Sequence, residues 1–181
     1  KRFLFVPMDS TTMFWLAIKN AKIGGEDNPG TIRNELLHEY KDFHPFVKEL
    51  LLNSANFIRS DLADLGTGKR KWYQDKIVFT GDAIHATTPN LAQGGCQAIE
   101  DAYCLSLLMK KSSHDFSEVF PVYQSLREKK VSFIVNTSWR FGKIAHHPVL
   151  SGMAKYFLKY MSDRSVMMLE KKLNDLSYIN H

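Results

Sequence analysis

Apolar and polar positions form two strand-like stretches near the start of the chain and then change to helical spacing. "RFLFVPM" and "MFWLAIK" are rich in Phe, Val, Trp and Ile, and the polar "DSTT" between them is typical of a turn. This pattern predicts a β-hairpin. Helices are predicted next over 29–41 and 45–53, and "NFIRSDL" predicts a return to a strand.

A continuously apolar strand, a loop and a helix are predicted in the middle of the chain. "KIVFTGD" is typical of a strand buried on both faces. After the loop, the pattern over 97–110 predicts a helix with one apolar face, made of Ala98, Ala102, Leu105 and Met109. Such a strand needs neighbours in a parallel sheet. Because the sequence offers none, we expect the chain to be part of a larger fold.

The last third of the chain is predicted to be helical. A long helical pattern follows "SSHD", with one apolar stripe, and "HHPV" interrupts it. The stripe comprises Phe120, Tyr123, Ile134 and Phe141. A helix is predicted over about 150–161, and Asp163 is the expected N-cap of the last one. The order of elements predicts an α+β fold in three blocks, 1–62, 63–111 and 112–181.

Composition narrows the class of protein. The chain has 181 residues, 44% of them hydrophobic and 24% charged, which is ordinary for a domain that buries a core. No apolar run reaches the roughly 20 residues that span a bilayer, and no signal-peptide pattern is present. The net charge of +5 is mostly dispersed, which favours solvated helix faces over a nucleic-acid surface.

The cysteines and histidines indicate neither a disulfide nor a metal site. Cys96 and Cys104 lie eight positions apart, or about 12 Å if they share a helix, which is too far for a disulfide. There is no HxxxH pair and no CxxC pair. Unpaired cysteines fit a reducing compartment, and we therefore expect a cytoplasmic location.

Candidate chemistry gathers where the predicted strand ends and the helix begins. Asp82 follows the strand, at the sheet edge where open α/β sheets bind ligands, and Gly81 before it allows close approach. A carboxylate there is suited to accept hydrogen bonds from polyol hydroxyls. Gly94 and Gly95 precede the predicted helix, so its first amides are open donors for an anionic or electron-rich group. Reduced flavin suits both features, whereas the alternative for Asp82 alone is an ordinary turn.

The stretch "GDAIHATTPNLAQGGCQAIEDA" resembles the second flavin-binding motif of the FAD-dependent aromatic hydroxylases, the group-A flavoprotein monooxygenases of the para-hydroxybenzoate hydroxylase fold. "YQSLR" at 123–127 resembles the Y-E-x-x-R of the same family, and "RFLFVPM…MFWLAI" resembles strands of its substrate domain. The G-x-G-x-x-G that opens such enzymes is absent. The resemblance thus implies an α+β fragment, the C-terminal half only: part of the substrate-domain sheet, one strand-loop-helix of the FAD domain and a helical C-terminal tail.

The resemblance implies a role for each matching residue. Asp82 would accept a hydrogen bond from the FAD ribitol, and Pro89 would lie beside the isoalloxazine ring. Backbone amides at 94–96 would face the N1–C2=O edge of that ring. The expected cofactor-binding set is Gly81, Asp82, Pro89, Gln93, Gly94, Gly95 and Cys96. His85 and Asp101 match the motif and are expected to fix the loop and the helix, while Ala92 stands where the family often has Gly.

The implied activity of the whole enzyme is insertion of one oxygen atom from O2 into a small aromatic or unsaturated substrate, with NAD(P)H as the reductant of FAD. Substrate contacts are expected from Phe3, Phe5, Phe14 and Trp15, and ordinary sheet core is the equal alternative. Expected partners are the missing N-terminal half or a second copy. Two alternative functions remain: a non-catalytic remnant that binds a partner chain, and a related flavoenzyme such as a halogenase or reductase.

Overall fold

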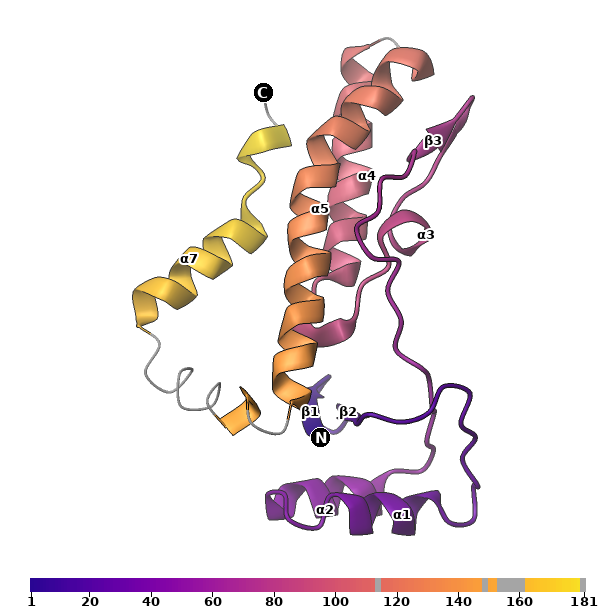
Figure 1. The fold of residues 1–181 in the computed structure, drawn as a ribbon, viewed down its shortest axis with the longest axis vertical. Helices are drawn as coiled ribbons and strands as arrows, with labels where there is room; N and C mark the ends of the chain where they lie inside the picture. The colour runs from indigo at the N-terminus through magenta and orange to yellow at the C-terminus, as the bar shows by residue number, and fades with distance from the viewer. Residues whose placement is uncertain (113–114, 148–149, 153–161, 180–181) are drawn as a thin grey trace. The chain divides into compact units, whose positions relative to one another are not determined.

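The computed structural model describes residues 1–112, 115–147, 150–152 and 162–179. Within them the chain forms two compact units, an N-terminal unit Lys1–Asp61 and a C-terminal unit Leu62–His181 (Figure 1). The described strands form two small antiparallel sheets of two strands each, and helices make up most of the regular structure. The chain therefore has the predicted α+β class of fold. The three-block division of the sequence remains a prediction.

The N-terminal unit opens with the predicted hairpin. Strands β1 (Arg2–Pro7) and β2 (Met13–Ile18) pair antiparallel. The carboxylate of Asp9 accepts the backbone N–H groups of Thr11 and Thr12, both at 2.7 Å, and so closes the turn. A short acceptor side chain at the start of a turn does this without help from the rest of the fold, which is why the turn was predictable.

Two helices follow the hairpin. Helix α2 (Pro45–Asn53) has the predicted bounds, with Pro45 at its first position, where a missing N–H costs nothing. Helix α1 (Ile32–Glu39) is shorter than the predicted 29–41. The backbone carbonyl of Asn28 accepts the N–H groups of Thr31 and Ile32, so a turn occupies the start of the predicted range.

The core of the N-terminal unit lies between these helices and one face of the hairpin. Tyr40, Val47 and Leu51 are buried there, and Phe3 and Trp15 from the hairpin pack against them. The rings of Phe3 and Trp15 stack with centroids 5.3 Å apart. For these two aromatic residues, the alternative reading as sheet core is therefore confirmed.

The opposite face of the hairpin is apolar and exposed. Leu4, Val6 and Phe14 are 44%, 44% and 47% exposed. The register pairs Val6 with Phe14 and Phe5 with Trp15, and successive residues of a strand point to opposite faces. Phe14 thus lies on the face opposite to Phe3, Phe5 and Trp15. The substrate contacts expected of these four residues stay a prediction.

The strand predicted for "NFIRSDL" does not form, and residues 56–62 have no regular structure. Ile58 in this stretch is 93% exposed. A strand requires backbone partners as well as β-forming residues, and no strand of the N-terminal unit pairs with this segment.

The C-terminal unit is built on two long helices that pack side by side, α4 (Gly94–Lys111) and α5 (Phe116–His146) (Figure 1). Helix α4 begins three residues before the predicted start. The predicted apolar stripe of α5 is buried at Phe120, Tyr123 and Ile134, whereas Phe141 is 38% exposed. The core cluster between the elements comprises Trp72, Ile84, Cys104, Tyr123, Val131, Val135 and Ile179.

The strand predicted over "KIVFTGD" is reduced to β4 (Ile77–Val78), which pairs antiparallel with β3 (Tyr73–Gln74). Ile77 and Phe79 are 61% and 38% exposed, so within this chain the segment is not buried on both faces. The sequence predicts that burial only where neighbouring strands cover it. Within the described residues β4 has a strand partner on one edge only. Its Ile77 is exposed, whereas Val78 packs against the core.

The end of the chain returns to the core. Helix α7 (Asp163–Asn174) is capped by Ser162, whose side chain accepts the N–H of Ser165, and not by Asp163 as predicted. The short 3-10 helix η2 (Ser177–Ile179) then buries Ile179. Of the helix predicted over 150–161, residues 150–152 are helical and the remainder lies outside the described residues. None of the described helices has the length and hydropathy needed to cross a membrane.

The Tyr40 hydroxyl gives a test of the N-terminal core. It is buried and has no hydrogen-bond partner among the described residues. Burial, aided by the charge of Glu39, raises the pKa of Tyr40 to about 12. We expect Tyr40→Phe to leave the free energy of unfolding unchanged or to raise it by up to about 1 kcal/mol, because no bond is lost.

Trp15→Phe is the control for this test, since the Trp15 indole N–H donates to Ser54 Oγ at 2.8 Å. Loss of this bond and of ring area should lower the free energy of unfolding by about 1 kcal/mol or more. Urea unfolding measures both variants. A Tyr40→Phe loss as large as that of Trp15→Phe would show that the hydroxyl is bonded.

Candidate functional site

Strand β4 ends at Val78, and residues 79–81, called the strand tip below, lead from it to Asp82. The chain turns sharply at Gly81. Gly81 is buried and adopts φ +56° and ψ −139°, a region that is open almost only to glycine. A Cβ added there would lie 3.1 Å from the Cβ of Ala98 on α4. The glycine thus permits both the turn and the close approach of the strand tip to the helix.

Asp82 is the first residue of the short helix α3 (Asp82–His85), and its side chain is exposed. Within the described part of the chain the carboxylate has no hydrogen-bond or ion-pair partner. It is a free acceptor at the tip of a strand, which is the geometry expected for binding a hydroxyl.

The loop after α3 is attached to α5. It contains the 3-10 helix η1 (Pro89–Leu91), which places Pro89 half-buried. The Ser138 hydroxyl donates to the Thr88 carbonyl at 2.6 Å, and the Asn90 amide donates to the Ser138 carbonyl at 2.8 Å. These bonds hold the loop between the strand tip and α4 in one conformation.

The start of α4 presents unpaired backbone donors. Gln93 is the N-cap and makes no side-chain capping bond, and the first bonded amide of the helix is that of Gln97, to the Gln93 carbonyl at 2.9 Å. Among the described residues, no partner is found for the N–H groups of residues 94–96. Gly94 and Gly95 lie inside the first turn instead of before the helix, which corrects the predicted start and leaves the expected open amides in place.

A buried carboxylate on α4 connects this helix to the strand tip. Asp101 on α4 is fully buried, and its Oδ2 accepts the backbone N–H of Gly81 at 2.8 Å and lies 2.6 Å from His85 Nε2. Its Oδ1 accepts Arg127 Nε at 2.7 Å. Burial alone would raise the pKa of Asp101, but hydrogen bonds from His85, Gly81 and Arg127 outweigh burial and leave this pKa below its usual value. The expected structural role of His85 and Asp101 agrees with these bonds.

Arg127 is the buried cation that pairs with Asp101. It is fully buried on α5, and its Nη2 donates to both the carbonyl (3.0 Å) and the side-chain oxygen (2.9 Å) of Gln97. Burial lowers its pKa, but the bond and the charge of Asp101 outweigh burial, so the net shift is upward and the group stays charged. The sequence signal for this residue was the "YQSLR" resemblance, but sequence reasoning did not connect Arg127 with Asp101.

A second layer of polar groups closes the interior. Glu100 lies 2.6 Å from Arg127 Nη1 and 2.9 Å from Lys130 Nζ. Tyr178 of η2 donates to Glu100 at 3.0 Å and also contacts Arg127, while Lys130 donates to the carbonyl of Asp175 at 2.7 Å. The two carboxylates and two cations of this interior balance in charge, and the end of the chain covers them.

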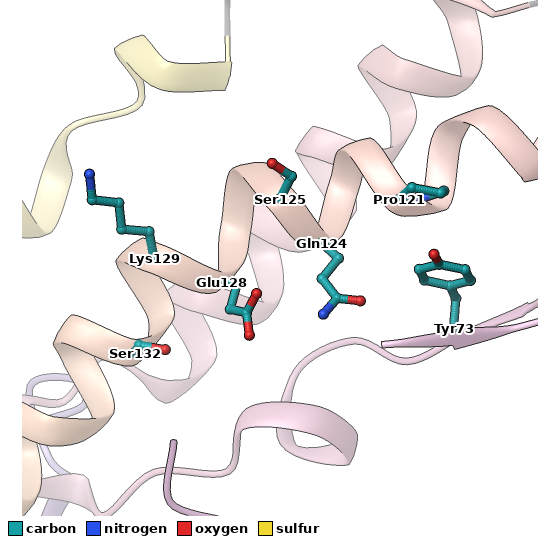
Figure 2. A pocket seen from close by; sticks show the side chains of 7 residues that line it. All are labelled: Tyr73, Pro121, Gln124, Ser125, Glu128, Lys129 and Ser132. Atoms are coloured by element: carbon teal, nitrogen blue, oxygen red, sulfur yellow. The ribbon is translucent and has the colours of Figure 1, made fainter. Parts of the chain in front are cut away.

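A surface hollow of the C-terminal unit lies elsewhere. Figure 2 shows it along α5, with a volume of about 630 Å³ and a mostly polar lining of Tyr73, Pro121, Gln124, Ser125, Glu128, Lys129 and Ser132. Gln124 there accepts the N–H of Trp72 and donates to the carbonyl of Arg70, so its amide is used in the fold. No predicted site residue lines this hollow, and we do not assign the site to it.

The residues present fit the flavin that the motif implies. A free carboxylate lies at the strand tip, and unpaired amides lie at the start of α4. Both are attached to a single buried cluster through Gly81 and Gln97. A Cβ added at Gly95 would meet nothing within 4 Å, so space is open at this helix end. An acceptor and a row of donors of this kind suit a ligand with hydroxyls at one end and an electron-rich edge at the other.

Sequence comparisons find FAD-dependent monooxygenases. The chain is 35% identical to aurachin C monooxygenase/isomerase of Stigmatella aurantiaca over 79% of its own length and 37% of that protein. It is 30% identical to 2-heptyl-3-hydroxy-4(1H)-quinolone synthase of Pseudomonas aeruginosa over 80% of its own length and 38% of that protein. The zeaxanthin epoxidase of Spinacia oleracea is 34% identical over 55% of the chain. No family model matches.

Structure comparison finds the same fold. Klebsiella pneumoniae HpxO complexed with FAD and uric acid matches with a TM-score of 0.67 and 20% identity, over 88% of this chain and 40% of that one. A variant of HpxO complexed with FAD matches with a TM-score of 0.73 and 21% identity. The chain spans less than half the length of the curated relatives it matches.

The conformation of Gly81 predicts a large effect of a small substitution. We expect Gly81→Ala to lower the free energy of unfolding by about 1–3 kcal/mol, because a Cβ is strained at this φ and ψ and crowds Ala98. Urea unfolding of the chain measures this change.

Ala92→Gly is the matched control in the same loop. Ala92 has φ +53° and ψ +33°, the left-handed region, where a Cβ costs roughly 1–2 kcal/mol. Removal of this strain and the greater freedom of glycine in the unfolded chain should nearly cancel, leaving a change under about 1 kcal/mol. Wild-type stability of Gly81→Ala would contradict the role given to Gly81.

Proposed function

We propose that this chain, which is related by sequence and fold to the C-terminal portion of FAD-dependent monooxygenases, supplies the flavin-facing half of the site of such an enzyme. The observation that carries the proposal is the pairing of a free carboxylate at Asp82 with the unpaired amides of residues 94–96, both supported by one buried cluster.

In this proposal each group of the site has one role. Asp82 accepts a hydrogen bond from a ribitol hydroxyl of FAD. The amides of Gly94, Gly95 and Cys96 donate to the electron-rich edge of the flavin ring, where the partial positive charge of the helix start favours negative charge. Pro89, held half-buried in η1, lies beside the ring, and Gln93 occupies the N-cap position of α4. When bound, FAD supplies the redox chemistry with NAD(P)H and O2.

The proposed reaction of the complete enzyme is insertion of one oxygen atom into a small aromatic or unsaturated substrate. The names of the relatives support this class, since they include a hydroxybenzoate and a quinolone, which are both aromatic. In this enzyme the chain's own residues bind and orient the cofactor. No side chain of this chain is proposed as a catalytic acid or base. We also propose a cytoplasmic location, which the free state of Cys96 and Cys104 supports.

The proposed partner is the remainder of a longer protein, with self-association as the alternative. Exposed apolar side chains support a partner: Leu4, Val6 and Phe14 on the hairpin, Ile77 in the short strand β4 and Phe79 directly after it. A strand with one paired edge offers backbone groups to another strand. A second candidate function follows from the same exposure, because a chain that has lost flavin binding could retain a partner-binding role.

Asp82→Ala tests the proposed acceptor in the full-length protein. A hydrogen bond to a charged acceptor contributes about 1.5–3 kcal/mol, so FAD affinity should fall roughly ten- to a hundredfold. Because the side chain is exposed and unpaired, the melting temperature without FAD should not change. Flavin titration and thermal melts measure the two effects. Asp163→Ala is the matched control, since Asp163 is also the exposed first residue of a helix. Unchanged FAD affinity in Asp82→Ala would contradict the proposed role.

The 181-residue chain on its own should not retain FAD. It lacks the G-x-G-x-x-G fingerprint for the pyrophosphate, so only the ribitol and ring contacts remain. Purified chain should elute from gel filtration without flavin absorbance. Addition of the remainder of the longer protein as a separate chain should restore FAD binding. Stoichiometric flavin in the isolated chain would contradict the proposed division of the site.

A further inference from the structure

We propose that Arg127 is a positioning residue for the flavin site, which holds the strand tip and the start of α4 in one fixed arrangement. This inference rests on the proposed function, because it concerns the same two groups that would contact the cofactor. Arg127 itself is fully buried and belongs to neither of them. It acts through Gln97 and Asp101.

The guanidinium group spans a full turn of α4. Its Nη2 holds both oxygens of Gln97, the residue directly after the three unpaired amides, and its Nε holds Asp101, four residues further along. Three bonds from one planar group therefore set the rotation and height of the helix start. A helix held at two points one turn apart cannot turn about its axis without breaking at least one bond.

Asp101 extends this control to the strand tip. The oxygen that Arg127 leaves free accepts the backbone N–H of Gly81 and contacts His85. Gly81 is the residue before Asp82. Two hydrogen bonds in series thus connect Arg127 to the backbone at the proposed ribitol acceptor. The distance between this acceptor and the amides of α4 depends on this buried connection.

The chemistry of arginine explains why this residue type suits the role. A guanidinium is planar and presents its N–H groups in a rigid fork, whereas a lysine ammonium is a point charge on a flexible stem. Lys130, one turn further on α5, provides the contrast within the same cluster. It is also nearly buried and contacts Glu100 and the Asp175 carbonyl, and among the described residues its ammonium contacts neither Asp101 nor Gln97.

Two charge-conserving substitutions in the full-length protein separate positioning from general support of the fold. Arg127→Lys retains the positive charge but removes the planar guanidinium group. Lys130→Arg is the control, which also retains the charge and replaces the neighbouring ammonium with a guanidinium. For each variant, the affinities for FAD and for ADP and the melting temperature are measured. ADP reports the adenosine half of the cofactor site, which the proposed function assigns to the remainder of the protein.

The expected result is a selective loss. Arg127→Lys should weaken FAD binding roughly tenfold, about what the loss of one charged hydrogen bond entails, and leave ADP affinity unchanged. Lys130→Arg should leave both affinities within about twofold of wild type. If Arg127→Lys does not fold, Asp101→Asn, which keeps the side-chain shape, is measured by the same criteria.

Two results would overturn the inference while leaving the proposed function in place. One is wild-type FAD affinity in Arg127→Lys. The other is an equal loss of FAD and ADP affinity, which would show that Arg127 only supports the fold. Absence of FAD binding by the wild-type full-length protein would overturn both proposals together.

Discussion

The carboxylate of Asp101 is the interaction on which the C-terminal unit depends. From helix α4 it joins two parts of the chain that are far apart in sequence: the strand tip with α3, through Gly81 and His85, and helix α5, through Arg127. Removal of one partner of such a buried ion pair typically costs 3–5 kcal/mol, because the other charge is left without compensation. Asp101 and Arg127 balance each other in charge, and Glu100 and Lys130 add one negative and one positive charge beside them.

The candidate site contains two kinds of polar group: buried groups that fix the backbone, and exposed groups that are proposed to contact the cofactor. Asp101, Arg127, Gln97 and His85 are buried, and their polar atoms are used inside the protein. Asp82 and the first amides of α4 are open and unpaired within the described residues. Groups that are already in place need no ordering when a ligand arrives, and affinity gains from this preorganisation. The same arrangement explains why the hollow along α5 is a poor candidate for the site, since its residues serve the fold.

Apolar surface is exposed on the hairpin and at β4, and the chain spans less than half the length of the curated relatives it matches. The hairpin presents Leu4, Val6 and Phe14 to solvent, and β4 has only a two-residue partner. In a complete α/β sheet a strand such as "KIVFTGD" would be covered on both faces. Both the short strands and the helix-rich interior follow from backbone hydrogen bonding. A helix pairs its backbone groups within itself, whereas a strand requires another strand as a partner.

The sequence by itself determined the local elements and the chemistry of the loop. The hairpin, α2 and the long α5 follow from alternation, capping and helical spacing, which act between residues close in sequence. The sequence also pointed to Gly81, Asp82, Gly94 and Gly95 as candidate cofactor-binding residues, because they lie in a fixed order within one short motif. Only the tertiary structure decided which predicted strands form, since "NFIRSDL" and most of "KIVFTGD" lack partners, and which hairpin face is core. It also decided that Arg127 meets Asp101 across 26 positions. Such a pairing depends on how two helices pack, and no local pattern in the chain encodes that distance.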